Sequence, residues 1–432
     1  MSATSTAGPS PDSTPLDDTS SDGPARPAKT RHGIPGRGLL LVATGVIVAA
    51  ALVRTVSGAD DLTSSGTVGA ALGLAVPIGM AALGGLWSER AGVVNIGLEG
   101  MMILGTFGAG WIGWQHGPWA GLLAGIGLGA LGGLLHAVAT VTFGVDHIVS
   151  GVAINLLAMG VTQFLASVVF TGTPGGGKTQ SPQIRAPGTV SIPGVGALLR
   201  GVEERHWFLI SDLAGLLRGL STGISLVTVL ALALVGVTGW VLWRTPFGLR
   251  LRSCGEEPYA AETLGVNVSR YKYIAVTISG GLAGFGGAYL AVVAASIYRE
   301  GQTGGRGFIG LAAMIFGNWR PGGLLSGAAL FGYTDALQLR NAEAVHALLL
   351  LLALGLIALA VLQGTRRRWV VAATALTGAA AALALYLTTD SLPGQVTFMT
   401  PYLTTLFVLA LASQRLRMPK ADGQIYRKGG GH

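Results

Sequence analysis

Long apolar runs separated by short polar turns dominate the chain after its first 38 residues. Ten of these runs are close to the roughly 20 residues that an α-helix needs to cross a bilayer core about 30 Å thick. They lie near residues 39–56, 67–87, 92–115, 118–143, 149–171, 223–244, 273–297, 345–364, 369–388 and 399–414. The pattern predicts an all-α, polytopic membrane protein with about ten transmembrane helices.

One region departs from this pattern of full-length runs. Residues 308–338 contain two shorter apolar pieces, which are split by Asn318, Trp319, Arg320 and Pro321. Proline lacks a backbone N–H and fits the start of a helix better than its interior. We therefore expect a broken pair of half-helices between the full spans.

Composition agrees with a membrane protein and divides the chain into three parts. Half of the residues are hydrophobic and only 11% are charged, against about a quarter in ordinary soluble domains. Residues 1–37 are rich in Ser, Thr, Pro, Asp and Gly, so they predict a disordered cytoplasmic tail. Residues 38–414 form the predicted transmembrane domain, and residues 415–432 a cytoplasmic C-terminal tail.

The formal charge of +8 indicates how the chain is oriented in the membrane rather than binding to nucleic acid. Lys and Arg cluster between and beyond the apolar runs, where basic residues mark the cytoplasmic side. The clusters are the N-terminal tail, the loop from Arg244 to Lys272, the triplet from Arg366 to Arg368, and the C-terminal tail. All four clusters lie on the same side of the membrane if residues 308–338 enter and leave the membrane from the opposite side. Both termini are then cytoplasmic.

The stretch GTPGGGKT, residues 172–179, matches the spacing of a phosphate-binding P-loop. A working P-loop needs a strand before it and a helix after it. Here an apolar span precedes the stretch, and Pro182, Pro187 and Pro193 follow it. We therefore interpret it as a turn that opens a long external loop, 172–222. The piece 202–220 of that loop is amphipathic, which is compatible with an interfacial helix that packs as a lid or docks an external protein.

Two stretches suggest an internal repeat with inverted direction. NIGLEGMM, residues 95–102, aligns with FIGLAAMI, residues 308–315, and PWAGLLAG, residues 118–125, resembles PGGLLSG, residues 321–327. On the predicted topology the two copies cross the membrane in opposite directions. Inverted repeats with interrupted helices are typical of transporters that bind substrate where the halves meet.

Several polar side chains fall inside the apolar runs. Asn95 and Glu99 lie four residues apart, which predicts one face of one helix. A carboxylate inside a bilayer costs roughly 2.5–3.5 kcal/mol, so Glu99 should face a polar cavity or the protein interior. Two interpretations stay open, a role in a translocation pathway and a buried hydrogen bond to the second repeat. Asn155 and Asp335 present the same alternatives.

Other polar residues have simpler structural explanations. Asp146 suits the N-cap of the fifth span, and His136 predicts a hydrogen bond between helices. Ser88, Glu89 and Arg90 predict a tight turn in which the two charges offset each other. No nucleophile paired with a base and no metal-ligand cluster emerges, so the sequence does not favour an enzyme.

The basic loop TPFGLRLRSCGEEPYAAETLGVNVSRYKYI contains a well-punctuated short helix. Pro258 suits its first position, the acidic pair before it suits its positive end, and Gly265 suits its stop. We expect a helix over residues 258–264 that docks another protein.

SERAGVVNIGLEGMM, TPFGLRLRSCGEEPYAAETLGV, GFIGLAAMIFGNWRPGG, and PYLTTLFVLAL followed by ADGQIYRKG resemble permease subunits of ATP-binding-cassette (ABC) importers. The resemblance covers most of residues 66–430 and is nearest the nucleoside-type branch, which is related to simple-sugar and branched-chain amino acid permeases. It implies a multi-pass subunit of the bacterial plasma membrane that binds no cofactor itself. Its implied partners are a cytoplasmic ATPase that uses ATP, a second and related permease chain, an extracellular substrate-binding lipoprotein, and membrane lipid.

By that resemblance residues 255–265 correspond to the helix that couples a permease to its ATPase. The expected coupling residues are Glu256, Glu257, Pro258, Tyr259, Ala260, Ala261, Glu262 and Gly265, and the expected pathway residues are Asn95, Glu99, Asn155 and Phe308. Two alternatives remain. One is a secondary transporter that uses Glu99 as an ion site, and the other is an ABC permease for sugars or branched-chain amino acids.

Overall fold

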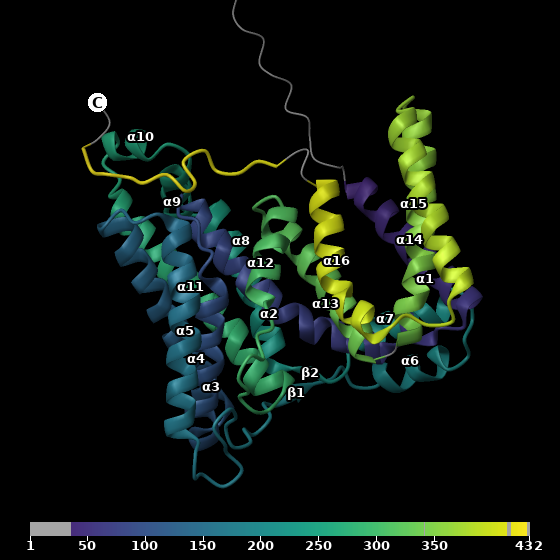
Figure 1. Ribbon diagram of the computed structural model, residues 1–432, viewed down its shortest axis with the longest axis horizontal. Coiled ribbons are helices and arrows are strands. Elements are labelled where there is room, and N and C mark those ends of the chain that lie inside the picture. Colours follow the sequence, from purple (N-terminus) through teal and green to yellow (C-terminus); the bar gives the residue numbers. More distant parts are fainter. Residues whose placement is uncertain (1–35, 341, 413–415, 430–432) are drawn as a thin grey trace, which may run out of the picture. The chain divides into compact units, whose positions relative to one another are not determined.

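The computed structural model describes residues 36–340, 342–412 and 416–429 (Figure 1). The predicted disordered tail, residues 1–37, falls almost entirely outside these ranges. The chain divides into two units, residues 1–45 and 46–432. The first unit contributes only the beginning of helix α1 to the description, and the remaining elements belong to the second.

The described residues are mostly helical. The helices before the predicted external loop are α1 (Gly36–Ser57), α2 (Ser65–Arg90), α3 (Leu98–His116), α4 (Pro118–Ala137) and α5 (His147–Val169), with the short 3₁₀ helix η1 (Asp60–Leu62) and the π-helix η2 (Val138–Thr142). The predicted external loop contains α6 (Val195–Glu203), α7 (Ile210–Gly219) and the short strand β1 (Thr189–Val190), and strand β2 (Ile224–Ser225) follows it. The later helices are α8 (Leu226–Arg244), α9 (Pro246–Glu256), α10 (Pro258–Thr263), α11 (Val268–Tyr289) with turn η3 (Leu290–Ala294), α12 (Arg306–Phe316), α13 (Pro321–Arg340), α14 (Ala342–Thr365), α15 (Trp369–Thr388) and α16 (Gly394–Ala412).

Seven helical segments of the described residues are long and apolar enough to cross a membrane. They are Ser65–Arg90, Pro118–Thr142, His147–Val169, Leu226–Arg244, Val268–Ala294, Glu343–Thr365 and Trp369–Thr388. Helices α1, α3 and α16 form where spans are predicted but are not among these seven, so the predicted count of ten stays a prediction. The polytopic, all-α architecture itself is confirmed.

The predicted break within residues 308–338 is present, because α12 ends at Phe316 and α13 begins at Pro321. The second piece, α13, is 20 residues long but is not among the seven apolar segments. Two local predictions are wrong. Helix α3 begins at Leu98, and Asn95 lies in a non-helical linker of residues 91–97, because Gly92 (φ 79°) turns the chain after α2. The loop piece 202–220 is not one helix. The chain breaks between α6 and α7.

Helices α2 and α11 cross in opposite directions at the centre of the packing. Gly84 of α2 approaches the carbonyl of Ser279, and Gly286 of α11 approaches the carbonyl of Pro77. Helices α12 and α13 also pack on α2, whereas α3 and α4 pack on α11. A Cβ atom at Gly129 of α4 would lie 2.4 Å from the carbonyl oxygen of Gly280, so small residues permit this close contact.

A small two-stranded sheet joins the middle of the predicted external loop to the residues just before α8. Strands β1 and β2 pair antiparallel, with Thr189 opposite Ser225 and Val190 opposite Ile224. The P-loop-like stretch 172–179 forms turns, and the next helix, α6, begins only at Val195. It therefore lacks the helix that a phosphate-binding loop requires.

Candidate functional site

The carboxylate of Glu99 caps the start of helix α12. Glu99 lies in the first turn of α3 and is 7% exposed. Its Oε1 accepts a hydrogen bond from the N–H of Gly305 at 2.9 Å, and its Oε2 accepts one from the N–H of Gly307 at 2.7 Å. The positive end of α12 thus compensates the buried charge. This geometry is a buried hydrogen-bonded contact with the start of α12, which contains the stretch that the sequence aligned with residues 95–102.

Only glycine fits where α3 and α12 meet. A Cβ atom at Gly307 would lie 2.6 Å from the Cα of Glu99. Gly305 and Gly307 were not among the predicted site residues, although the run GGRGF, residues 304–308, is a signal of close backbone approach.

Two asparagines hold the beginning of α3. Asn155 of α5 accepts a hydrogen bond from the N–H of Gly100 at 2.7 Å and donates one to the carbonyl of Ile96 at 3.1 Å. Asn95, which is fully buried, donates to the hydroxyl of Ser279 in α11 at 2.9 Å. Asn95 and Glu99 therefore reach different partners from different elements, and the expectation that they share one helical face is wrong.

Helix α12 is also held from two other sides. Arg306 forms an ion pair with Asp335 of α13 at 2.6 Å, and the hydroxyl of Tyr402 in α16 donates to the carbonyl of Gly304 at 3.0 Å. Phe308, in the first turn of α12, is 47% exposed. The structure thus brings Glu99 and Phe308 to one helix start, which three other helices fix in place.

The other end of α2 is tied to the turn between α12 and α13. The indole N–H of Trp319 donates to Glu89 at 2.6 Å, and the guanidinium of Arg90 donates to the carbonyl of Trp319 at 2.7 Å. Glu89 and Arg90 belong to the last turn of α2 rather than to a separate turn, and each uses Trp319 as a partner. The prediction that they form a free turn and mainly offset each other is wrong.

The predicted short helix is present as α10. Pro258 stands at its first position, Leu264 caps it, and Gly265 (φ 80°) ends it, as the sequence predicts. Leu264 is 84% exposed and Tyr259 37% exposed. Five of the expected coupling residues lie on α10, namely Pro258, Tyr259, Ala260, Ala261 and Glu262. Glu256 ends α9, and Glu257 joins the two helices.

Helix α9 was missed by the sequence analysis. Its signal was present, because Thr245 accepts a hydrogen bond from the N–H of Gly248 and Pro246 occupies the first helical position. The sole cysteine, Cys254, is buried in α9, and burial raises the pKa of its thiol to about 11. It is an unreactive packing residue.

The C-terminal segment 416–429 lies along α9 and α10 (Figure 1). The N–H of Ala421 donates to the carbonyl of Gly255 at 2.9 Å, and the ammonium of Lys420 pairs with Glu257 at 3.1 Å. The ring of Tyr426 packs on Tyr259, with centroids 5.5 Å apart. This segment was predicted only as a cytoplasmic tail, because its polar sequence gives no sign of docking.

Asp422 of this segment is inserted beneath α9. It is 9% exposed and lies near Glu89, Lys272 and Arg90. Burial raises the pKa of Asp422 to about 7, against the opposing effects of contact with Glu89 and of the nearby Lys272. The ammonium of Lys272 also donates to the carbonyl of Gly92, in the linker before α3.

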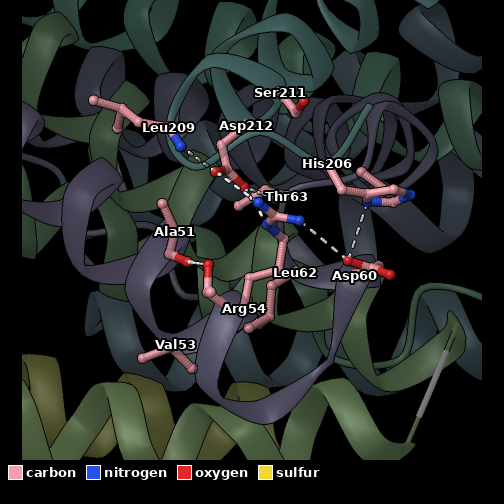
Figure 2. A network of polar contacts seen from close by, with 12 residues as sticks. Ala51, Val53, Arg54, Asp60, Leu62, Thr63, His206, Leu209, Ser211 and Asp212 are labelled. Atoms are coloured by element: carbon pink, nitrogen blue, oxygen red, sulfur yellow. Dashed lines mark hydrogen bonds and ion pairs between the residues drawn. The ribbon is translucent and has the colours of Figure 1, made fainter. Parts of the chain in front are cut away.

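Charged contacts hold the loop helices α6 and α7 at the opposite end of α2. Arg54 of α1 pairs with Asp212 of α7 at 2.7 Å (Figure 2), and both side chains are almost fully buried. Asp212 also accepts from the hydroxyl of Thr63 and from the N–H of Leu209. Glu203 accepts from the N–H of Ser65, the first residue of α2, at 2.8 Å.

Two remaining structural predictions are confirmed. Asp146 accepts hydrogen bonds from the N–H groups of Ile148 and Val149 at the start of α5. His136 of α4 bonds through one ring nitrogen to the hydroxyl of Ser150 in α5 at 2.8 Å. Both contacts fix α5, which carries Asn155.

The sequence of residues 67–360 matches the family described as the branched-chain amino acid transport system permease component. The chain belongs to this permease family. The permease is therefore a transport subunit and a multi-pass membrane protein, and the resemblance predicted from its sequence motifs is confirmed.

Three relatives illustrate the match. A guanosine ABC transporter permease protein of Bacillus subtilis is 41% identical over 280 residues, which cover 63% of this permease and 81% of the relative. A nucleoside ABC transporter permease protein of Lactococcus lactis is 34% identical over 82% of the permease and 93% of the relative. A putative glucose ABC transporter permease protein of Haloferax volcanii is 33% identical over 84% and 98%, respectively. No solved structure gives a significant match.

Proposed function

We propose that the permease imports nucleosides by alternating access, as one membrane subunit of an ATP-driven importer. The observation that carries this proposal is its similarity to a nucleoside permease over 93% of that relative's length, together with the exposed helix α10 at one end of the fold. The permease itself binds no cofactor in this proposal. ATP is used by a partner ATPase.

The proposed orientation places α10 and both termini in the cytoplasm. The C-terminal segment lies against α9 and α10, so two of the basic clusters share one end of the fold. The loop helices α6 and α7 pack at the start of α2, which is the other end of that helix. They then face the outside, where the substrate-binding lipoprotein delivers its cargo.

Helix α10 receives the ATPase in this proposal. Its exposed Leu264 and Tyr259 provide an apolar contact for the ATPase. Gly255, at the end of α9 just before α10, lies in close contact with the backbone of Arg90 and Gly92. Movement of α10 is therefore transmitted to the end of α2 and to the linker before α3 through this backbone contact.

The two halves of the permease form an inverted repeat in this proposal. The packing partners support it, because α12 and α13 pack on α2 just as α3 and α4 pack on α11. Exchanging α2, α3 and α4 with α11, α12 and α13 reproduces the same pairs. The contact of Glu99 with the start of α12 then lies where the two repeats meet, and Asn95, Asn155 and Phe308 belong to the same proposed pathway and gate.

A second, related permease chain and lipid cover the remaining apolar surface in this proposal. Helix α5 presents Leu156, Leu157 and Phe164, which are 55–67% exposed. A surface of this kind is stable only against lipid or another membrane chain.

Reconstitution tests the proposed function. The permease, co-expressed with its ATPase and second permease chain, should accumulate radiolabelled guanosine in vesicles only when ATP is supplied to the ATPase side. Purified alone, it should accumulate nothing on a proton or sodium gradient. Gradient-driven uptake by the permease alone would instead support the secondary transporter, and competition by glucose but not by guanosine would support the sugar permease.

Glu99→Gln tests the proposed gate. The amide keeps the shape but loses the charge that faces the start of α12, a loss of about 1–2 kcal/mol, so we expect uptake to fall about tenfold. Glu204→Gln, an exposed glutamate of the external loop, is the matched control and should transport normally. Unchanged uptake by Glu99→Gln, at equal amounts of complex in the membrane, would exclude Glu99 from the gate.

A further inference from the structure

A cavity of about 490 Å³ lies between the outer parts of α2, α8 and α11. None of the predicted pathway residues lines it. Its walls come from Gly69 and Gly73 of α2, Thr228 of α8, and Tyr289 of α11, and its rim includes Thr189 and Ile224 from the two short strands. Pockets for small molecules typically have volumes of roughly 300–1,000 Å³, so its size is sufficient for a nucleoside.

Among the residues that the structure describes, the lining combines hydroxyl groups with apolar surface and contains no charged side chain. Five hydroxyl groups belong to it, those of Thr189, Thr222, Ser225, Thr228 and Tyr289. Apolar surface comes from residues such as Leu72, Pro187 and Val293. A ligand that is uncharged, carries several hydroxyl groups and has one flat apolar part is complementary to such a lining.

Two buried hydroxyl groups form the most defined polar feature of the cavity. The hydroxyls of Tyr289 and Thr228 are hydrogen-bonded to each other at 2.8 Å, and the two residues are 2% and 3% exposed. A hydroxyl pair can both donate and accept, so it can exchange its internal hydrogen bond for bonds to a ligand. Ser225, beside them, accepts from the N–H of Val227 and fixes the start of α8.

The glycines of α2 keep the cavity open. A Cβ atom at Gly73 would lie 3.6 Å from the hydroxyl oxygen of Tyr289, which is ordinary van der Waals distance. A larger side chain at position 73 would therefore project into the cavity without disturbing the backbone. Glycine at this position leaves space that packing between α2 and α11 would otherwise fill.

We propose that this cavity is the outward-facing nucleoside site of the permease, in which the Tyr289 and Thr228 hydroxyls bind the ribose and the apolar wall contacts the base. The inference rests on the proposed function for its substrate and for its orientation. It places first contact with the nucleoside within one permease chain, between α2, α8 and α11. The contact between Glu99 and α12 then acts at a later step.

Protection of an introduced cysteine tests the site directly. The only natural cysteine of this chain, Cys254, is buried, so a membrane-impermeant maleimide added outside reports on the introduced thiol when labelling of this chain is read separately from its partners. Gly73→Cys places a thiol in the cavity, whereas Ser191→Cys places one on the exposed residue beyond β1. In the intact importer, guanosine should slow labelling of Gly73→Cys at least fivefold and leave Ser191→Cys unchanged, and glucose should protect neither.

Transport by two further variants separates the site from the proposed function. Gly73→Val should reduce guanosine uptake at least tenfold, and Tyr289→Phe should raise the KM about fivefold to tenfold at similar maximal rate. Gly236→Val is the matched control, because a Cβ atom there meets nothing within 4 Å. Each complex should be present in equal amount and keep the basal ATPase rate.

The outcomes are distinguishable. If the wild-type importer takes up guanosine but Gly73→Val transports like Gly236→Val, or guanosine fails to protect Gly73→Cys, the cavity inference is wrong and the proposed function stands. If the wild-type importer takes up no nucleoside, or Ser191→Cys reacts only from the cytoplasmic side, the proposed function fails, and the inference that rests on it fails too.

Discussion

The two ends of helix α2 are held by different kinds of contact. At its start, opposite charges and directed hydrogen bonds join α1 and the loop helices. Arg54 pairs with Asp212 (Figure 2), and Glu203 accepts a hydrogen bond from the N–H of Ser65. At its other end, Glu89 bonds to the neutral indole of Trp319 and lies near a second carboxyl group, that of Asp422.

In the proposed orientation the start of α2 is its outer end and its last turn is its inner end. The difference in contacts predicts that the outer end is rigid and the inner end adjustable. At the outer end the pKa of Glu203 is low, because the hydrogen bond from Ser65 and the contact with Arg218 outweigh its burial. Its charge is therefore fixed over the physiological range. At the inner end, burial holds the pKa of Asp422 near 7, so its charge changes there. In the proposed orientation the adjustable end is the one that receives the push from the ATPase.

Breaking the ion pair at the outer end should have the largest effect. Asp212→Ala leaves the guanidinium of Arg54 buried without its main partner, so we expect the free energy of unfolding to fall by about 3–5 kcal/mol. The measurement is thermal unfolding of the detergent-purified permease.

Asp60 provides the control for this experiment. It pairs with the same Arg54 at 3.2 Å, but its side chain is 62% exposed. Asp60→Ala should therefore cost less than about 1 kcal/mol. Equal destabilisation by the two substitutions would show that burial does not distinguish the contacts and that the outer end is not a fixed anchor.

Removing the indole hydrogen bond at the inner end should have an intermediate effect. Trp319→Phe keeps a large ring but leaves a carboxylate oxygen of Glu89 without its donor, at a cost of about 1–3 kcal/mol. Trp87→Phe is the control on the same helix, because the indole of Trp87 donates only to the neutral hydroxyl of Thr238. If Trp87→Phe unfolds at the lower temperature, the contact between Glu89 and Trp319 does not hold the inner end.

Local signals along the sequence predict the helices well and their partners poorly. Hydropathy locates α2, α4, α5, α8, α11, α14 and α15, and Pro258 and Gly265 locate α10, because each signal acts within a few residues. The Glu99 contact joins residues 206 and 208 positions apart, and nothing in the sequence near Glu99 indicates which helix donates hydrogen bonds to it.

The linker before α3 and the C-terminal segment show why some positions and contacts could not be predicted from the sequence. Residues 91–97 are as apolar as a span, so hydropathy does not reveal that Gly92 turns the chain and leaves Asn95 outside the helix. The C-terminal segment is polar, which usually indicates exposure to solvent. Its docking depends on Asp422 and Tyr426 fitting among residues of α2, α9 and α11, which only the folded chain brings together.

Over a change of one pH unit, protonation of Asp422 should give the smallest effect and the one that separates the two ends most clearly. Because its pKa is raised to about 7 in the folded state from an ordinary value near 3.8, the folded permease binds the proton more tightly than the unfolded chain. Docking of the C-terminal segment should therefore be strongest at low pH and weaken as pH rises toward 7, by at most ~1.4 kcal/mol per pH unit for one proton. Hydrogen exchange of the N–H of Ala421, which donates to Gly255, measures this docking.

Asp422→Asn should abolish the pH dependence of docking, whereas Lys420→Ala, which removes an exposed ion pair, should keep that dependence. A pH dependence that persists in Asp422→Asn would assign the titration to another group and remove the proposed contrast between the two ends of α2.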